Sequence, residues 1–424
     1  MRVHAPPSAP AEISKSFLIV GAGLAAIGIG SLGFLAIVSR ALTERDFARF
    51  GVWFALVNVV SFGLFVPLET AIARALLSGA EFVGQMRRET FRYMCVAFGV
   101  VLAIGLVFER IVLPRLMNDS WGLVAITLCY SSLLALQTIQ RGVAVGRSLY
   151  WPLFWQFAVD GAFRLSVPAM MIAAGNATIE AFAFSIVASA ALGLVAGQLA
   201  ISRAKREPAR CRTPVGLDRR ALVSLVVAAI GVQLLANGAP PILSLAGRDS
   251  ATVLAGVVGA LALTRVPLLF SSAIQAPLLP PMVRLIRSGE TTALWRLLAR
   301  ILAGFGALGC VAFVTGWYFG ASVLRTYLGD DYGAHPISMA MLASAGVALL
   351  AVIAVQAAVV AIEAHGTLAS AWFLGIAVFL GMTAIPVDGL ILAPIAIMVA
   401  TVVTLAAMLI GLRWATNAHS SEPQ

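Results

Sequence analysis

Charged side chains are scarce in this chain, and those that interrupt apolar stretches are the candidates for chemistry. Of 424 residues, 60% are hydrophobic and 11% are Asp, Glu, Lys or Arg. Asp160 and Arg164 lie four residues apart, so a helix places them on one face, either as a structural ion pair or as a proton- or ion-coupled pair. Arg265 has no acidic residue within one helical turn. Because an unpaired charge in apolar surroundings is costly, its partner must be a residue on another helix, water or the substrate. We favour an anionic substrate, to which Asn58 could add a hydrogen bond.

Other charged residues stand near the ends of apolar stretches. Three arginines there either extend toward polar surroundings or bind phosphate as a substrate enters and leaves. These candidate substrate-binding residues are Arg40, Arg74 and Arg284. Glu69 is expected to form a local ion pair with Arg74. Arg141 and Glu363 each lie late in a stretch, and we expect them to pair between the two halves of the chain as a gate.

Metal and cofactor chemistry is not expected. The four cysteines and four histidines are scattered, without a CxxC pair or the ligand spacing of a zinc site. Neither Lys15 nor Lys205 follows the glycine pattern of a nucleotide phosphate-binding loop. The sequence therefore predicts no metal site, no cofactor and no ATP hydrolysis.

Long apolar segments must position these residues. A soluble globular chain carries about 25% charged residues, so this composition and a mean hydropathy of +0.96 exclude a water-soluble enzyme or binding domain. The runs are continuous, unlike the alternating segments of a membrane β-barrel. At about 20 residues per span, the sequence predicts about 12 transmembrane helices, near 16–38, 50–77, 91–108, 121–145, 151–174, 178–201, 221–245, 252–280, 295–318, 337–362, 367–385 and 390–413.

A basic stretch divides the chain almost in half. It contains Pro208 and Pro214, which argue against a continuous helix. The predicted fold is an all-α polytopic membrane protein with two pseudo-symmetric six-helix lobes. Its predicted parts are a cytoplasmic N-terminal tail (1–15), an N-terminal lobe (16–202), a basic cytoplasmic connector (203–220), a C-terminal lobe (221–414) and a cytoplasmic C-terminal tail (415–424).

The basic residues favour one side of the membrane. With both termini in the cytoplasm, about 20 basic residues fall on the cytoplasmic side and about 7 outside, which is a strong positive-inside bias. The net charge of +10 is therefore attributed to cytoplasmic loops, and no nucleic-acid partner is expected. We expect a multi-pass protein of the cytoplasmic (inner) membrane of a bacterium.

The two halves of the sequence share an internal repeat. Matching stretches occur in the same order at an offset of about 210 residues, at 66–79 and 276–289, 112–122 and 323–333, and 146–149 and 366–369. An even number of spans per half makes the repeats parallel, and such halves usually hold a substrate between them near mid-membrane. The matched Pro67 and Pro277 either bend the walls of a central cavity or are simply tolerated in membrane helices.

The first apolar segment has a face of small residues. Ala22, Ala26 and Gly30 follow one another at four-residue spacing. Such a face lets a neighbouring backbone approach closely, whereas the alternative use of the glycines is a bend during a working cycle. We favour close packing.

The stretch SRALTERDFARFGVWFAL, residues 39–56, resembles the first outer loop of the polysaccharide flippases in the multidrug/oligosaccharidyl-lipid/polysaccharide exporter superfamily. The residues that match the family pattern are Arg40, Leu42, Asp46, Phe47 and Phe50, whereas Ala48 stands where the family usually has Gly. Gly146-Arg147, and Leu328-Gly329 before Tyr332, also look like family features. The resemblance covers nearly the whole chain. It implies twelve helices in two lobes, a cavity that opens alternately to each side, and a lipid-linked glycan as cargo.

The resemblance implies a flippase-type transporter, not an enzyme. It would move a polyprenyl-linked saccharide across the cytoplasmic membrane by alternating access, for cell-envelope polysaccharide synthesis. The expected partners are the polyprenyl-linked glycan, the lipid bilayer, and glycosyltransferases or a polymerase of the same pathway. One alternative is a proton- or sodium-coupled multidrug or metabolite exporter of the same fold. Another is an integral-membrane glycosyltransferase, polymerase or ligase, against which the short outer connections argue.

Overall fold

The computed structural model describes a bundle of long helices, without a strand in the described part of the chain. The described residues are 9–77, 84–111, 121–204, 219–247, 250–264, 268, 278, 282–286, 288–329 and 335–421. Within them, ten helices are long and apolar enough to cross a membrane. The chain is therefore an all-α polytopic membrane protein, as the sequence predicts.

The N-terminal half forms the first group of helices, called lobe 1. It comprises α1 (Ala9–Ala41), α2 (Glu44–Leu77), α3 (Gln85–Ile111), α5 (Trp121–Gly146), α6 (Tyr150–Ala173) and α7 (Ile179–Arg203). Two of these helices have a threonine as the N-cap residue. Thr43 accepts the backbone N–H of Asp46 at 3.2 Å, and Thr178 accepts that of Ala181 at 3.2 Å. These N-caps satisfy backbone donors that would otherwise lack partners, so a polar turn precedes both α2 and α7.

The C-terminal half forms lobe 2. It comprises α8 (Arg219–Asn237), α9 (Ala239–Ala246), α10 (Ala251–Thr264), α12 (Thr291–Leu328), α13 (Pro336–Ala361), α14 (His365–Thr383) and α15 (Gly389–Ser421). Its first segment is broken at Gly238, because Pro240 and Pro241 directly after it have no backbone N–H to continue the hydrogen bonds of α8. The eighth predicted span, 252–280, is described as a helix as far as Thr264.

The helices follow the predicted apolar segments in order, but the outermost helices are longer than expected. α1 begins at Ala9 and α15 ends at Ser421, inside the predicted tails 1–15 and 415–424. A helix of 33 residues measures about 50 Å, whereas the hydrocarbon core is about 30 Å thick. Both helices therefore extend beyond the lipid. Residues 205–218 of the predicted connector lie outside the described residues.

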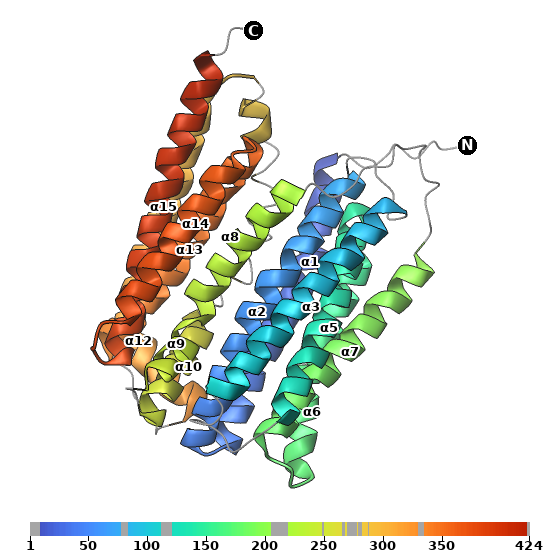
Figure 1. The fold of residues 1–424 in the computed structure, drawn as a ribbon, viewed down its shortest axis with the longest axis vertical. Helices are drawn as coiled ribbons and strands as arrows, with labels where there is room; N and C mark the ends of the chain where they lie inside the picture. The colour runs from blue at the N-terminus through green and yellow to red at the C-terminus, as the bar shows by residue number, and fades with distance from the viewer. Residues whose placement is uncertain are drawn as a thin grey trace.

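The two lobes lie side by side, lobe 1 at the right of Figure 1 and lobe 2 at the left, with α2 in contact with α8 and α10. The start of α1 and the end of α15 lie at the same end of the bundle, here called the terminal end (Figure 1). The turn between α1 and α2 and the short α9 lie at the opposite end, here called the distal end.

Two glycines of α2 bring the lobes together. A Cβ atom at Gly51 would lie 2.6 Å from Val258 Cγ1 on α10, and one at Gly63 would lie 2.9 Å from Ile230 Cγ1 on α8. A larger residue would require the Val258 or Ile230 side chain, or the helix that carries it, to shift, since such distances are shorter than van der Waals contact. We call the contact of α2 with α8 and α10 the seam. One continuous apolar cluster crosses the seam and includes Phe50, Val57, Ala228, Leu235 and Val258.

Glycines also set the packing of α1 on α6. A Cβ atom at Gly30 would lie 2.3 Å from the carbonyl oxygen of Gly161, and one at Gly161 would lie 2.5 Å from that of Ala26. The two backbones are therefore in direct contact, which lets dispersion forces act over a wide area without lipid between the helices. The predicted use of the small residues for close packing is confirmed at Ala26 and Gly30.

Pro67 lies inside α2, four residues after Gly63. A proline there removes the hydrogen bond to the Gly63 carbonyl and favours a bend. The next carbonyl, that of Leu64, accepts a hydrogen bond from the Tyr93 hydroxyl on α3. The turn of α2 that is prone to bend is therefore bound by α3 of the same lobe. Pro277, its match in the repeat, lies outside the described residues.

Substitution of the two glycines of α1 separates close packing from helix propensity. We expect Gly30→Ala to lower the thermal unfolding temperature in detergent, because its methyl group meets a backbone; overpacking of this kind costs about 1–3 kcal/mol. Gly21→Ala lies on the same helix with nothing within 4 Å of the added carbon. It should leave stability unchanged or raise it. An equal loss in both variants would contradict the packing role.

Candidate functional site

The seam is packed at mid-depth and exposed toward the terminal end. Thr70 and Arg74 follow Gly63 by about two and three turns on the same face of α2, and both are exposed. On α8, Val223 lies two turns before Ile230 on the face that meets α2, and it is 63% exposed. The two helices thus present accessible faces on the terminal side of their packed contact. These faces are the candidate site.

Asn58 lies on α2 between Gly51 and the exposed Thr70 and Arg74. It follows Gly51 by seven residues, so it lies on the face of α2 that packs against α10. Its amide Nδ2 donates to the Phe54 carbonyl at 2.8 Å, and the side chain is partly exposed. The predicted partner in substrate binding, Arg265, directly follows the last residue of α10 and lies outside the described residues.

The predicted arginines at the helix ends lie at opposite ends of the bundle. Arg74 lies in the last turn of α2 and Arg284 in the short helical stretch before α12; both are exposed. Arg40 lies in the last turn of α1 at the distal end, and its Nη2 donates to the Thr326 carbonyl at 2.7 Å. It also borders a groove of about 470 Å³ between α1, α10 and α12, together with Ala36, Leu263, Ser322, Val323, Thr326 and Tyr327.

Asp160 and Arg164 form an ion pair inside lobe 1. Arg164 Nε donates to Asp160 Oδ1 at 2.8 Å, and the two side chains are 8% and 3% exposed. Arg164 Nη1 also donates to the Ser31 hydroxyl on α1 at 3.1 Å. The Tyr130 side chain of α5 lies beside the pair. These contacts neutralise the carboxylate within its own lobe, away from the seam.

Arg141 is bound within lobe 1 and not to Glu363. Its Nε donates to Glu69 Oε2 at 2.7 Å, its Nη1 donates to Gln137 Oε1 at 3.5 Å, and its guanidinium lies 5.6 Å from the centre of the Phe157 ring. The expected gate pair is therefore not the pair that the structure forms. Glu363 is exposed at the turn before α14, in lobe 2.

The expected ion pair of Glu69 with Arg74 is also corrected. Five residues turn a helix by about 500°, so the two side chains point about 140° apart. Arg141 on α5 approaches the face of Glu69 instead, because Gly142 lets the two backbones meet. A Cβ atom at Gly142 would lie 2.9 Å from the Glu69 carbonyl oxygen.

Sequence reasoning missed the buried amides of lobe 1. Gln156 precedes Asp160 and Arg164 at four-residue spacing and is 1% exposed. Gln137 precedes Arg141 at the same spacing, and its Nε2 donates to the Ala190 carbonyl of α7 at 2.8 Å. A polar residue every fourth position in an apolar helix is the signal that could have found both. Gln137 ties α5 to α7, whereas the buried Nε2 atom of Gln156 has no hydrogen-bond partner among the described residues.

Lobe 2 differs from lobe 1 in the chemistry of its interior. The buried polar side chains among its described residues are uncharged, namely Ser224, Asn237, Ser244, Ser338, Ser344, Thr383, Thr401, Thr404 and Thr416. Three buried ionic side chains, Arg141, Asp160 and Arg164, lie in lobe 1. The buried charges of lobe 1 therefore have no counterpart among the described residues of lobe 2.

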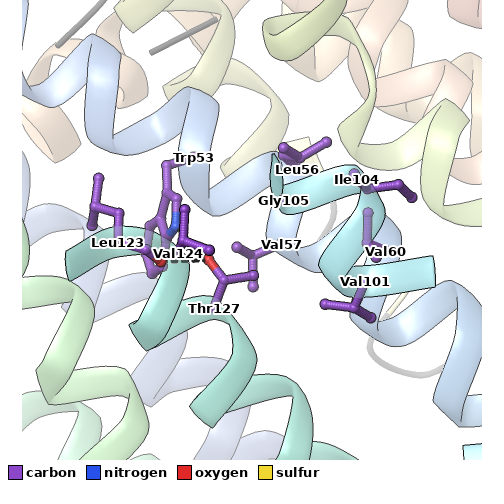
Figure 2. A pocket seen from close by; sticks show the side chains of 10 residues that line it. All are labelled: Trp53, Leu56, Val57, Val60, Val101, Ile104, Gly105, Leu123, Val124 and Thr127. Carbon is purple, nitrogen blue, oxygen red and sulfur yellow. Dashed lines mark hydrogen bonds between the residues drawn. The ribbon is translucent and has the colours of Figure 1, made fainter. Parts of the chain in front are cut away.

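One enclosed space lies within lobe 1, between α2, α3 and α5 (Figure 2). Its volume is about 20 Å³ and its walls are apolar apart from Trp53 and Thr127, whose Nε1 and Oγ1 atoms form a hydrogen bond of 2.9 Å. It has room for no more than a water molecule, so it is a packing gap and not a substrate site. No group of three metal-ligating side chains occurs in the part of the chain that the structure describes.

Several solved membrane transporters have a fold similar to that of this chain. Solved transporters match nearly the whole chain. A multidrug resistance MATE family transporter of the MOP superfamily, in its inward-facing conformation, has a TM-score of 0.59 at 13% identity over 93% of this chain and 94% of its own. A MOP superfamily transporter from Pyrococcus furiosus, whose reverse polarity of binding pocket suggests a different function, has 0.60 at 16% over 97% and 96%.

A eukaryotic MATE transporter has a TM-score of 0.61 at 16% identity, over 96% of this chain and 99% of its own. No protein-family model and no curated protein matches the sequence. The structural neighbours are thus MATE transporters of the MOP superfamily, and at these identities they show a common fold. The fold part of the predicted resemblance is confirmed.

Removal of one partner of the buried ion pair should be far more costly than removal of an exposed one. Asp160→Asn leaves Arg164 charged and uncompensated, which costs about 3–5 kcal/mol in buried sites. The matched control is Asp46→Asn, which removes the partner of Arg49 at 3.3 Å where Asp46 is 36% exposed; it should cost about 0–1 kcal/mol. Thermal unfolding in detergent compares them. Equal losses would show that the buried pair is not structural.

A second pair of variants identifies the partner of Arg141. Glu69→Gln should reduce stability by about 2 kcal/mol, because it weakens a hydrogen bond between charged groups. Glu363→Gln should leave the unfolding temperature unchanged, because Glu363 is exposed. The reverse order would favour the gate pair that the sequence first suggested.

Proposed function

We propose that this protein moves a polyprenyl-linked saccharide across the cytoplasmic membrane by alternating access. The observation that carries the proposal is the state of Asp160, the one buried carboxylate among the described residues. Its charge is compensated by Arg164 at 2.8 Å. Exchange of a proton or sodium ion needs a carboxylate that can give up its partner, so a fixed internal cation favours transport without such coupling.

Arginines at several depths suit a cargo that carries phosphate. Arg74 and Arg284 would meet the phosphate at the terminal end, and Arg40 would meet it in the groove at the distal end. Arg265 and Asn58 would bind it between them. Arg265 is included from the sequence alone, as a cation without an acidic residue within one helical turn.

The lipid tail of such a cargo needs an apolar surface at the edge of the seam. α1 packs mainly on α6, and α12 packs mainly on α13. Both therefore expose apolar side chains, including Ile29 at 66% on α1 and Val311 at 58% on α12. We expect the prenyl chain to remain in lipid beside these helices while the sugar and phosphate cross between the lobes.

The membrane potential would supply the driving force. Outward movement of one negative charge through an inside-negative potential gains about 2.3 kcal/mol per 100 mV. A diphosphate carries more than one such charge. This orientation has the terminal end in the cytoplasm of a bacterium, in agreement with the positive-inside bias. Glycosyltransferases or a polymerase of the same pathway would supply and consume the cargo.

The alternative is a proton- or sodium-coupled exporter of drugs or metabolites. It is favoured by the likeness to multidrug MATE transporters. A deletion strain with unchanged antibiotic susceptibility and reduced surface polysaccharide would favour the flippase over the exporter. The neighbours are transporters, which also supports transport over a membrane glycosyltransferase, polymerase or ligase.

Arg265→Ala tests the proposed phosphate contact. In proteoliposomes with a fluorescent polyprenyl diphosphate saccharide, we expect flipping to fall about tenfold, because a hydrogen bond to a charged group contributes about 1.5–3 kcal/mol. Arg265→Lys keeps the charge and should retain an intermediate rate. Arg300→Ala, an exposed arginine at the start of α12, is the matched control and should flip normally. Equal rates for Arg265→Ala and the unmodified protein would remove Arg265 from this role.

A further inference from the structure

The distal end holds a set of hydrogen bonds between the lobes, and one of them comes from Arg40, which the proposed substrate path also uses. Arg40 Nη2 on α1 donates to the Thr326 carbonyl on α12 at 2.7 Å. The buried Ser39 hydroxyl shares its one proton between the Leu328 carbonyl at 3.3 Å and the Ala36 carbonyl of its own helix at 3.1 Å. In the opposite direction, the Tyr327 hydroxyl donates to the Leu32 carbonyl of α1 at 2.7 Å. The three bonds between the lobes join the last turns of α12 to the distal part of α1.

The chemistry of a helix end explains why these contacts form here. The last four carbonyls of a helix have no partner within it, and Thr326 and Leu328 lie in the last turn of α12. The N–H of Gly329 donates to the Arg325 carbonyl at 2.8 Å. The carbonyls of Thr326 and Leu328 can therefore accept hydrogen bonds from other donors. A cation near a helix C-terminus is also favoured by the helix dipole. Ser39 and Arg40 thus cap a helix of the other lobe.

These bonds lie at the distal end, and the seam is also packed toward that end. Val258 and Gly51 meet about two turns from the distal ends of α10 and α2. Toward the terminal end, the exposed Val223 and Thr70 mark accessible faces. The distal half is therefore the closed half of the seam in this conformation. Alternating access requires that this half open in another conformation.

We infer that Ser39, Arg40 and Tyr327 form a latch that holds the distal half of the seam closed and breaks once in each transport cycle. The inference rests on alternating access and not on the identity of the cargo. A capped helix end suits a reversible latch, because water can satisfy the same carbonyls when the lobes separate. Hydrogen bonds of this kind have small net free energies, so the closed state is favoured without being locked.

The test measures opening at a buried site behind the latch. Val258→Cys is introduced into a variant without Cys95, Cys129, Cys211 and Cys310, and the protein is reconstituted in lipid nanodiscs. Val258 is 4% exposed, so a water-soluble maleimide should modify the new cysteine slowly. Tyr327→Phe should raise this rate roughly fivefold, as expected for loss of one hydrogen bond. Arg40→Ala should raise it further, because its donor is charged.

Two matched variants control for the substitutions themselves. Tyr318→Phe lies on the same helix at 73% exposure, and Arg45→Ala lies in the first turn of α2 with an exposed side chain. Both should leave the modification rate unchanged. Equal rates for Tyr327→Phe and Tyr318→Phe, or for Arg40→Ala and Arg45→Ala, would overturn the latch.

A distance measurement distinguishes opening of the distal end from loss of the fold. Spin labels at Arg45→Cys in lobe 1 and His335→Cys in lobe 2 report the separation of the distal ends, and a population at longer distance should grow in Tyr327→Phe. An unchanged distance distribution in a well-folded Tyr327→Phe variant would also overturn the latch. Neither measurement contains a saccharide. The latch can therefore be correct even if the cargo proposal fails. Whatever the flipping assay shows, the labelling and distance measurements still decide whether the latch exists.

Discussion

The close approach of α8 and α10 to the backbone of α2 is the contact on which the relation between the lobes depends. In lipid, apolar surface gains little from meeting other apolar surface, so helices associate where backbones can come close enough for dispersion to act. Gly51 and Gly63 supply that closeness at two depths. Beyond Gly63 the same face of α2 is exposed, and Pro67 lies at the change. The packed part of the seam therefore ends where α2 is prone to bend.

The distribution of charge separates structural from functional groups. Asp160, Arg164 and Arg141 are buried in lobe 1 and find their ionic partners within that lobe. Such pairs stabilise the lobe as a rigid unit, since movement of either partner would leave a charge uncompensated. The contacts between α1 and α12 are instead hydrogen bonds to backbone carbonyls. The proposed alternating access needs this division, because the lobes must stay intact while the contacts between them change.

The sequence predicted some of these contacts and missed others for a clear reason. The ion pair of Asp160 with Arg164 followed from four-residue spacing on one helix, which fixes both the distance and the direction of the side chains. Glu69 and Arg74 are five residues apart, and the extra residue turns them away from each other. The true partner of Glu69, Arg141, lies on another helix. No local spacing could find it, because the pairing depends on how closely α2 and α5 approach at Gly142.

The sequence by itself determined the class of protein, the order of its apolar segments and the small-residue face of α1. These follow from composition and helical periodicity, which are local properties of the chain. Only the tertiary structure decided which helices form the seam, which carboxylate Arg141 takes, and that Ser39 and Arg40 cap the end of α12. These contacts join residues as many as 289 positions apart. Ser39 and Arg40 bond to backbone carbonyls, which every residue carries, and Arg141 bonds to a carboxylate on another helix, so no local pattern of side chains could mark these partners in advance.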